Sequence, residues 1–132
     1  MKKLKYIILS CIIGLFLVAP VKAADRKVSV KTLLSGSTVT ASTAQTSSFL
    51  VSEYTEGIIY VDVTAESGTS TLDIIIQSSP DDSEWYTHTT IGQITATGNT
   101  LQGITNIGKY VRISYTVGGT SFTFSIKGVF KN

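Results

Sequence analysis

The residues that could carry out acid–base or nucleophilic chemistry in this 132-residue chain begin with its single histidine, His88. A Ser-His-Asp site needs an imidazole between a hydroxyl nucleophile and an orienting carboxylate. Thr87, Thr89 and Thr90 flank His88, but hydroxyl side chains occur throughout the chain and therefore mark no nucleophile. Strand alternation that buries Trp85 and Thr87 directs His88 outward. We therefore expect a solvated strand residue at this position, and we expect that the protein is not an enzyme.

Residues that could bind a metal ion are also few. A zinc site needs three or four His, Cys or carboxylate ligands, and the chain offers one histidine and one cysteine. Asp81, Asp82 and Glu84 share one segment and form a weak calcium candidate, because Ca²⁺ takes carboxylate oxygens as ligands. The alternative is a solvated turn in which Asp81 caps the backbone after Pro80. We expect the turn, and no metal or other cofactor.

The other acidic residues are scattered, and they do not predict a catalytic pair. Glycoside hydrolysis needs two acids that face each other across a cleft. The remaining acids lie at the ends of different predicted strands: Glu53, Glu56, Asp62, Glu66 and Asp73. Nucleic acid is not an expected partner, because residues 24–132 carry seven Lys and Arg against nine Asp and Glu, a net charge of −2.

Aromatic side chains are the remaining candidates for a binding site. Trp85 and Tyr86 are adjacent, so in a strand they face opposite ways and one of them is exposed. An exposed aromatic ring can serve as a stacking platform for a sugar ring. The alternative is that Trp85 fills the core of a small all-β domain. Both residues remain candidate ligand-binding residues.

The elements that must position these residues follow a leader. Residues 1–23 contain Lys2, Lys3 and Lys5, then a short apolar run and small residues before residue 24, which is typical of a secretory signal peptide. A retained membrane anchor is an alternative, although the apolar run is shorter than the ~20 residues that span a bilayer. Lipidation at Cys11 is a second alternative. Because Cys11 leaves with the leader, we expect an exported chain without a disulfide.

Alternation of apolar and polar residues with period two predicts strands along residues 24–132. Residues 111–117 and 122–130 alternate on either side of Gly118-Gly119, which predicts a hairpin around a Gly-Gly turn. Residues 59–64 and 72–76 alternate in the same way and predict a second hairpin. The shorter strand candidates are residues 28–32, 48–52, 85–91, 94–97 and 101–104.

About eight short strands, each with one apolar face, predict an all-β fold, a single antiparallel β-sandwich of jelly-roll or Ig-like type. We expect residues 49–132 to form its core and residues 24–48 to form a Ser/Thr-rich N-terminal strand and arm. Residues 35–48 are nearly all small and polar. They are typical of a polar edge strand with loops, or of an arm that pairs with the sheet edge of a neighbouring subunit.

A series of strand and turn segments keeps its order along the exported chain. Its main members are Tyr54-Thr55-Glu56-Gly57, Tyr60-Val61-Asp62-Val63-Thr64-Ala65, Gln77-Ser78-Ser79-Pro80-Asp81-Asp82, Trp85-Tyr86, Gly108-Lys109-Tyr110-Val111-Arg112 and Thr116-Val117-Gly118-Gly119-Thr120-Ser121. This series resembles small virion-associated β-sandwich proteins of tailed phages and prophages, over nearly the whole of residues 24–132. Such proteins tend to have Pro-Asp-Gly where this chain has Pro80-Asp81-Asp82. The resemblance implies an all-β structural protein that belongs to an assembly.

A second, partial resemblance covers the C-terminal half. Gln77-Ser78-Ser79-Pro80-Asp81 with Trp85, and later Tyr110-Val111-Arg112-Ile113, are similar to strands of discoidin-type and carbohydrate-binding jelly rolls. This resemblance implies a module that binds glycans or cell surfaces.

Together these observations predict a secreted, non-catalytic structural or adhesive subunit that resembles phage virion surface proteins and acts through self-assembly or surface attachment. The expected partners are copies of itself or a host surface or virion structure, with glycans as a further option. We expect no nucleic acid, and no membrane after signal cleavage. The expected location is the periplasm, cell surface or extracellular space, or the virion if the protein is phage-encoded. The alternative function is a carbohydrate- or cell-surface-binding module.

Overall fold

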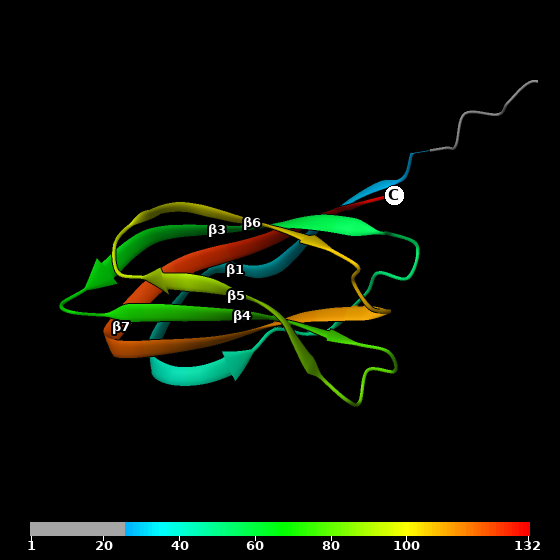
Figure 1. Ribbon diagram of the computed structural model, residues 1–132. Coiled ribbons are helices and arrows are strands. Elements are labelled where there is room, and N and C mark those ends of the chain that lie inside the picture. Colours follow the sequence, from blue (N-terminus) through cyan, green and yellow to red (C-terminus); the bar gives the residue numbers. More distant parts are fainter. Residues whose placement is uncertain (1–25) are drawn as a thin grey trace, which may run out of the picture.

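Seven strands make up the regular structure of residues 26–132, the part of the chain that the computed structural model describes (Figure 1). They are β1 (Val28–Gln45), β2 (Phe49–Leu50), β3 (Glu56–Ser67), β4 (Thr71–Ser79), β5 (Tyr86–Ile94), β6 (Gly98–Thr105) and β7 (Tyr110–Lys131). All pairs are antiparallel, which confirms the predicted all-β class. The predicted signal peptide lies outside the described residues. Within residues 26–132, no helix is long and apolar enough to cross a membrane.

The strands belong to one sheet, and two long strands run through all of it. β7 pairs with β4 through residues 110–118 and with β3 through residues 121–131. β1 lies along the other side of β7, and β2 continues that pairing at the far end. β5 lies outside β4, and β6 lies outside β3. The sheet therefore has a β4–β5 half and a β3–β6 half, which β7 and β1 join.

The sheet bends between these two halves. β7 passes there through Gly118-Gly119, and Gly119 has a φ of +79°, a left-handed conformation that glycine adopts readily. The register of β1 against β7 also shifts at this level, between Thr40 and Ser42. Extra residues of this kind bend a strand and increase its twist. The bend therefore involves β7 and the neighbouring part of β1, and it is not confined to the Gly118-Gly119 segment.

A buried serine in the β3–β4 link holds this bend. The Oγ of Ser70 accepts hydrogen bonds from the backbone N–H groups of Thr120 (3.0 Å) and Ser121 (3.2 Å) in β7. The same hydroxyl donates to the carbonyl of Ser67. Ser70 therefore ties the link to the bent segment of β7, and it satisfies backbone donors that a regular ladder would otherwise pair.

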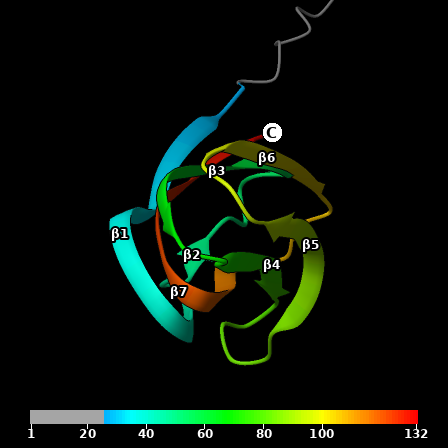
Figure 2. The same ribbon diagram turned by 90° about the vertical axis from the view of Figure 1, so that its left-hand side faces the viewer.

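The bend folds both halves around one hydrophobic core (Figure 2). Alternate side chains of the strands face inward, and together with Val51 after β2 they form a single cluster of eighteen buried residues. Its largest fully buried members are Phe122, Phe124 and Phe130 of β7. Each fully buried side chain of this size contributes roughly 1.5–3 kcal/mol relative to an exposed one. The core is therefore the main source of stability, and it belongs to both halves of the sheet.

Both predicted hairpins are wrong, for one physical reason. Residues 111–117 and 122–130 lie in a single strand, because Gly118-Gly119 bends β7 without reversing it. Residues 59–64 and 72–76 lie in β3 and β4, which follow each other along β7 rather than pair. Two runs of alternating apolar and polar residues with glycines between them predict two straight strand segments. The pattern does not show whether the chain reverses direction at the glycines or only bends there.

The prediction of two sheets also needs correction. Seven strands form one curled sheet instead of about eight strands in two separate sheets. The difference arises because β7 and β1 are each long enough to serve both halves. Their hydrogen-bond ladders continue from one half to the other, so the two facing surfaces remain parts of the same sheet.

Candidate binding surfaces

The turn after β4 carries the acidic candidates, and its own polar groups hold it. One carboxylate oxygen of Asp81 accepts hydrogen bonds from the backbone N–H groups of Ser83 (2.9 Å) and Glu84 (3.1 Å). The other accepts from the hydroxyl of Ser83 at 2.7 Å. These hydrogen bonds, led by the one from the Ser83 backbone, hold the pKa of Asp81 well below its usual range. Asp81 thus caps the turn, as predicted.

The calcium candidate remains a prediction. Both carboxylate oxygens of Asp81 are occupied within the turn, and Glu84 accepts a hydrogen bond from the hydroxyl of Tyr86 at 2.9 Å. Among residues 26–132, no three His, Cys, Asp or Glu side chains group closely enough to hold a metal ion. Asp82 has a φ of +67°, a conformation that favours glycine. This is the position at which the resembling phage proteins tend to have glycine.

Trp85 lies on the outer face of the sheet, so the interpretation that it fills the core is wrong. The Trp85 side chain is half-buried, immediately before β5. The guanidinium carbon of Arg112 lies 4.1 Å from the centre of its ring. The Nε of Arg112 donates to the side-chain oxygen of Gln77 at 2.7 Å. Neighbouring strands therefore bring together the two segments that resemble carbohydrate-binding jelly rolls, and Arg112 covers one face of the indole.

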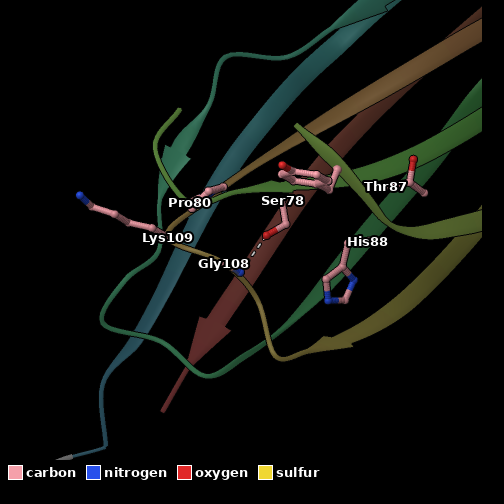
Figure 3. A pocket seen from close by; sticks show the side chains of 7 residues that line it. Ser78, Pro80, Thr87, His88, Gly108 and Lys109 are labelled. Atoms are coloured by element: carbon pink, nitrogen blue, oxygen red, sulfur yellow. Dashed lines mark hydrogen bonds between the residues drawn. The ribbon is translucent and has the colours of Figure 1, made fainter. Parts of the chain in front are cut away.

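Tyr86, the second aromatic candidate, is 59 % exposed and borders an open pocket of about 440 Å³ (Figure 3). The other residues that line the pocket are Ser78, Pro80, Thr87, His88, Gly108 and Lys109. The backbone N–H of Gly108 donates to the hydroxyl of Ser78 at 2.8 Å, which fixes one wall. In Figure 3 the Lys109 side chain extends away from His88. The pocket thus offers an aromatic ring, a proline and several hydroxyl and backbone groups.

His88 is half-buried and hydrogen-bonded, so it is less solvated than predicted. Thr87 lies opposite Gln77 and Thr89 opposite Ile76, which makes His88 an extra residue in β5. Such a bulge can re-aim a side chain. The Nε2 of His88 contacts the carbonyl of Thr105 at 2.8 Å, and its Nδ1 contacts the hydroxyl of Thr89 at 2.9 Å. His88 therefore connects β5 to the end of β6, across the two halves.

The free edges of the sheet are a further candidate surface, and β1, which contains most of the predicted polar edge segment of residues 35–48, forms one of them. In the described part of the chain, no strand pairs with the outer side of β1, β5 or β6. No Asp, Glu, Lys, Arg or Pro occurs from Thr32 to Ser52 or from Tyr86 to Thr105. Soluble proteins usually protect sheet edges with charges or prolines, because exposed edges pair with other chains. In the sequence, the length of these two uncharged stretches is the feature that indicates unprotected edges.

Comparison with known proteins places the fold but not the family. No protein-family model matches the chain, and no curated protein matches it in sequence. The PBSX exported protein XepA matches in structure with a TM-score of 0.63 at 13 % identity, over 77 % of this chain and 36 % of XepA. The chain thus spans about a third of the length of XepA.

Two further solved structures match over nearly their whole length. The SPBc2 prophage-derived protein YomS has a TM-score of 0.57 at 13 % identity, covering 85 % of this chain and 99 % of YomS. A structure of Bacillus endospore appendages, described as disulfide-linked pili, has a TM-score of 0.52 at 12 % identity, covering 86 % and 95 %. The predicted resemblance to phage and prophage proteins is confirmed for the fold. The resemblance to carbohydrate-binding jelly rolls stays a prediction.

Proposed function

We propose that this protein is an exported, non-catalytic structural subunit that assembles with copies of itself through the free edges of its sheet. The curled sheet serves as one compact body whose two halves share a single core. Its location is outside the cytoplasm, at the cell surface or in a surface appendage or virion. Its working groups are backbone N–H and C=O groups at the edges rather than a catalytic site.

The observation that carries this proposal is the absence of charge along both edges, apart from Lys31 near the start of β1. β1 from Thr32 onward offers an edge rich in Ser and Thr, and the edge of β5 and β6 is equally uncharged. The two edges belong to opposite sides of the sheet. Pairing of one edge with the other is head-to-tail, and such a contact generates open chains of subunits unless the rotation closes a ring.

The structural matches support an exported assembly. One match is an exported protein, one derives from a prophage, and one forms pili. The chain differs from disulfide-linked pili in one respect, because residues 24–132 contain no cysteine. Disulfides therefore cannot join copies of residues 24–132, and continuous strand pairing is a suitable non-covalent contact in their place.

The test is the assembly state of residues 24–132, measured by size-exclusion chromatography with light scattering and by negative-stain electron microscopy. We expect oligomers that grow with concentration. Two variants place lysines on one edge each, at exposed positions: Thr40→Lys/Ser42→Lys on β1, and Thr90→Lys/Asn99→Lys on β5 and β6. Lysine blocks edge pairing, so each variant alone should lose the long oligomers.

Mixing the two variants provides the decisive control. Each retains one intact edge of opposite kind, so the mixture should regain the edge contact and form larger species than either variant alone. Thr116→Lys on β7, at an exposed position that is paired with β4 on one side and β1 on the other, should leave the oligomers unchanged. A wild-type protein that stays monomeric at high concentration would overturn the proposal.

A second candidate function, binding of glycans, is favoured by the exposed ring of Tyr86 beside the pocket. A glycan array with residues 24–132 tests it. Binding that is lost in Tyr86→Ala and Trp85→Ala, but retained in the matched variant Tyr60→Ala, would support this function. Equal loss in all three variants would point to general destabilisation instead.

A further inference from the structure

The outer face of the β3–β6 half carries an apolar patch that the proposed edge contacts do not use. Six large apolar side chains of the described residues are exposed, and four of them lie on this face. Val30 and Leu101 are 65 % and 66 % exposed. These four exposed side chains and the half-buried Ile58 and Val129 form a surface that we call the outer patch. It consists of Val28, Val30, Ile58, Tyr60, Leu101 and Val129.

The strand register shows that these residues are neighbours. Tyr60 of β3 lies opposite Leu101 of β6. Two residues earlier in β3, Ile58 lies opposite Val129 of β7, and Val129 in turn lies opposite Val30 of β1. Residues directly opposite each other in antiparallel strands share a face of the sheet. The outer patch therefore crosses four strands as a continuous apolar stripe, and such a patch marks an interaction site.

The shape of the outer patch is complementary to itself. The row Val30–Val129–Ile58 ends at Gly103 of β6, and no atom lies within 4 Å of the place that a Cβ of Gly103 would occupy. One end of the row thus carries a protruding valine and the other end an empty position. A hollow of about 490 Å³ lies beside the row, and its lining includes Tyr60 and Leu101.

Charges on this face have the same self-complementary arrangement. Glu56 of β3 lies opposite Lys131 of β7, with their charged atoms 3.1 Å apart. Tyr60 of β3 lies opposite Lys127 of β7. These two rows therefore have an acidic or aromatic side chain on β3 and a basic one on β7, and the apolar row of Ile58 and Val129 lies between them. When two copies pack so that β3 of one lies over β7 of the other, unlike groups lie over each other.

We propose that a second copy of this chain packs on the outer patch, face to face, with a two-fold axis along the strands between β3 and β7. The inference rests on the self-association proposed above, but it names a different surface. β3 of each copy then covers β7 of the other, so Ile58 packs on Val129 and Glu56 faces Lys131 of the second copy. The sheet curls with this face outward (Figure 2), so we expect the closest contact at β3 and β7, next to the axis.

The partner on the outer patch is a second copy, because the sizes and charges of the facing side chains match when β3 of one copy lies over β7 of the other. Val30 of one copy then lies above the empty position at Gly103 of the other. Lys127 of the second copy then lies over Tyr60, at the hollow whose lining includes Asp62 as well as the first copy's own Lys127. A contact in which the same patch serves both partners closes as a dimer. Edge pairing can then link such dimers into larger assemblies.

The first test uses a matched pair of isoleucines. Ile58 of β3 and Ile75 of β4 are both half-buried on the outer face, and both neighbour β7. Dimerisation is measured by sedimentation equilibrium of residues 24–132. The protein carries all four edge substitutions, Thr40→Lys, Ser42→Lys, Thr90→Lys and Asn99→Lys, which block edge pairing. Ile58→Lys should weaken dimerisation at least about tenfold, whereas Ile75→Lys should change it less than about twofold.

The second test exchanges charges between copies. Glu56→Lys and Lys131→Glu each place like charges over each other in a homodimer, so each alone should be monomeric. An equal mixture of the two should restore dimers, because every contact across the axis again joins unlike charges. Thermal melts confirm that the variants fold.

The outcomes separate the two proposals. An edge-blocked chain that stays monomeric while the wild type forms oligomers overturns the face contact and leaves the edge contact standing. Equal effects of Ile58→Lys and Ile75→Lys, or a charge mixture without dimers, also overturn the face contact. Edge-blocked dimers that respond as predicted support it, even if long oligomers never form.

Discussion

The β4–β5 half and the β3–β6 half each present alternate side chains to the same core, with Ile74 in β4 and Val61 in β3 as equivalent examples. Their outer faces differ. On the β4–β5 half, Arg112 hydrogen-bonds to Gln77 and covers Trp85. On the β3–β6 half, Tyr60 and Leu101 lie exposed side by side.

This difference indicates what each face contributes. Polar side chains that bond to one another leave little to gain from a partner, because a partner must replace those contacts. Exposed apolar side chains gain free energy when they are covered. We therefore expect substitutions on the outer face of the β4–β5 half to change monomer stability, and substitutions on the β3–β6 half to change association.

Substitutions in the core, to which both halves contribute buried side chains, should have the largest effects on stability. Phe124→Ala and Ile74→Ala remove buried side chains on opposite sides, and we expect losses of about 3–5 and 2–5 kcal/mol in the free energy of unfolding. Urea unfolding followed by circular dichroism and by the fluorescence of the single tryptophan should give coincident transitions. Separate transitions for the two probes would show that the halves unfold independently.

The bend between the halves should give the next largest effect. A Cβ at Gly119 would lie 2.9 Å from the Cα of Ser70 and the carbonyl oxygen of Thr69, and φ there is +79°. Gly119→Ala should therefore destabilise the protein by about 1–3 kcal/mol in thermal or urea unfolding. Gly92→Ala in β5 is the control, since a Cβ there meets nothing within 4 Å. Equal effects at the two glycines would contradict the role of the bend.

On the outer face of the β4–β5 half, Arg112→Ala should cost roughly 0.5–2 kcal/mol, because the guanidinium loses its contacts with Trp85 and Gln77. Removal of the guanidinium also exposes the indole, so the emission of the single tryptophan should shift to longer wavelength. Lys127→Ala, on the exposed face of the other half, should change stability by less than about 0.5 kcal/mol and leave the emission unchanged. An unshifted emission in Arg112→Ala would show that the stacking is absent in solution.

The smallest effect concerns pH and the turn of the β4–β5 half. The pKa of Asp81 is lower in the folded state than in the unfolded state, where it is about 3.9. The ionised carboxylate therefore stabilises the fold above about pH 4, and this contribution is lost as the pH falls through the folded-state pKa. The stability difference between the wild type and Asp81→Asn should be present at pH 7 and should shrink toward pH 2. A difference that does not vary with pH would contradict this role.

The sequence by itself determined the class of the fold and most of the core. Alternation along residues 111–117 and 122–130 assigned Val111, Ile113, Phe122 and Phe124 to one side, and all four are buried. It also determined the cap at Asp81, since short polar side chains bond to nearby backbone groups in turns. These features depend on neighbours within a few residues, which a sequence pattern records directly.

Only the tertiary structure decided which strands pair and which surfaces remain. The bend at Gly118-Gly119 depends on Ser70, about fifty residues away, so local alternation could not separate it from a hairpin turn. The re-aimed ring of His88 depends on a bulge against β4, and the position of Trp85 depends on Arg112 in β7. Likewise the outer patch exists only because four strands, distant in sequence, align their exposed apolar residues in one register. Contacts of this range are set by packing of the whole chain, and no single segment contains the information.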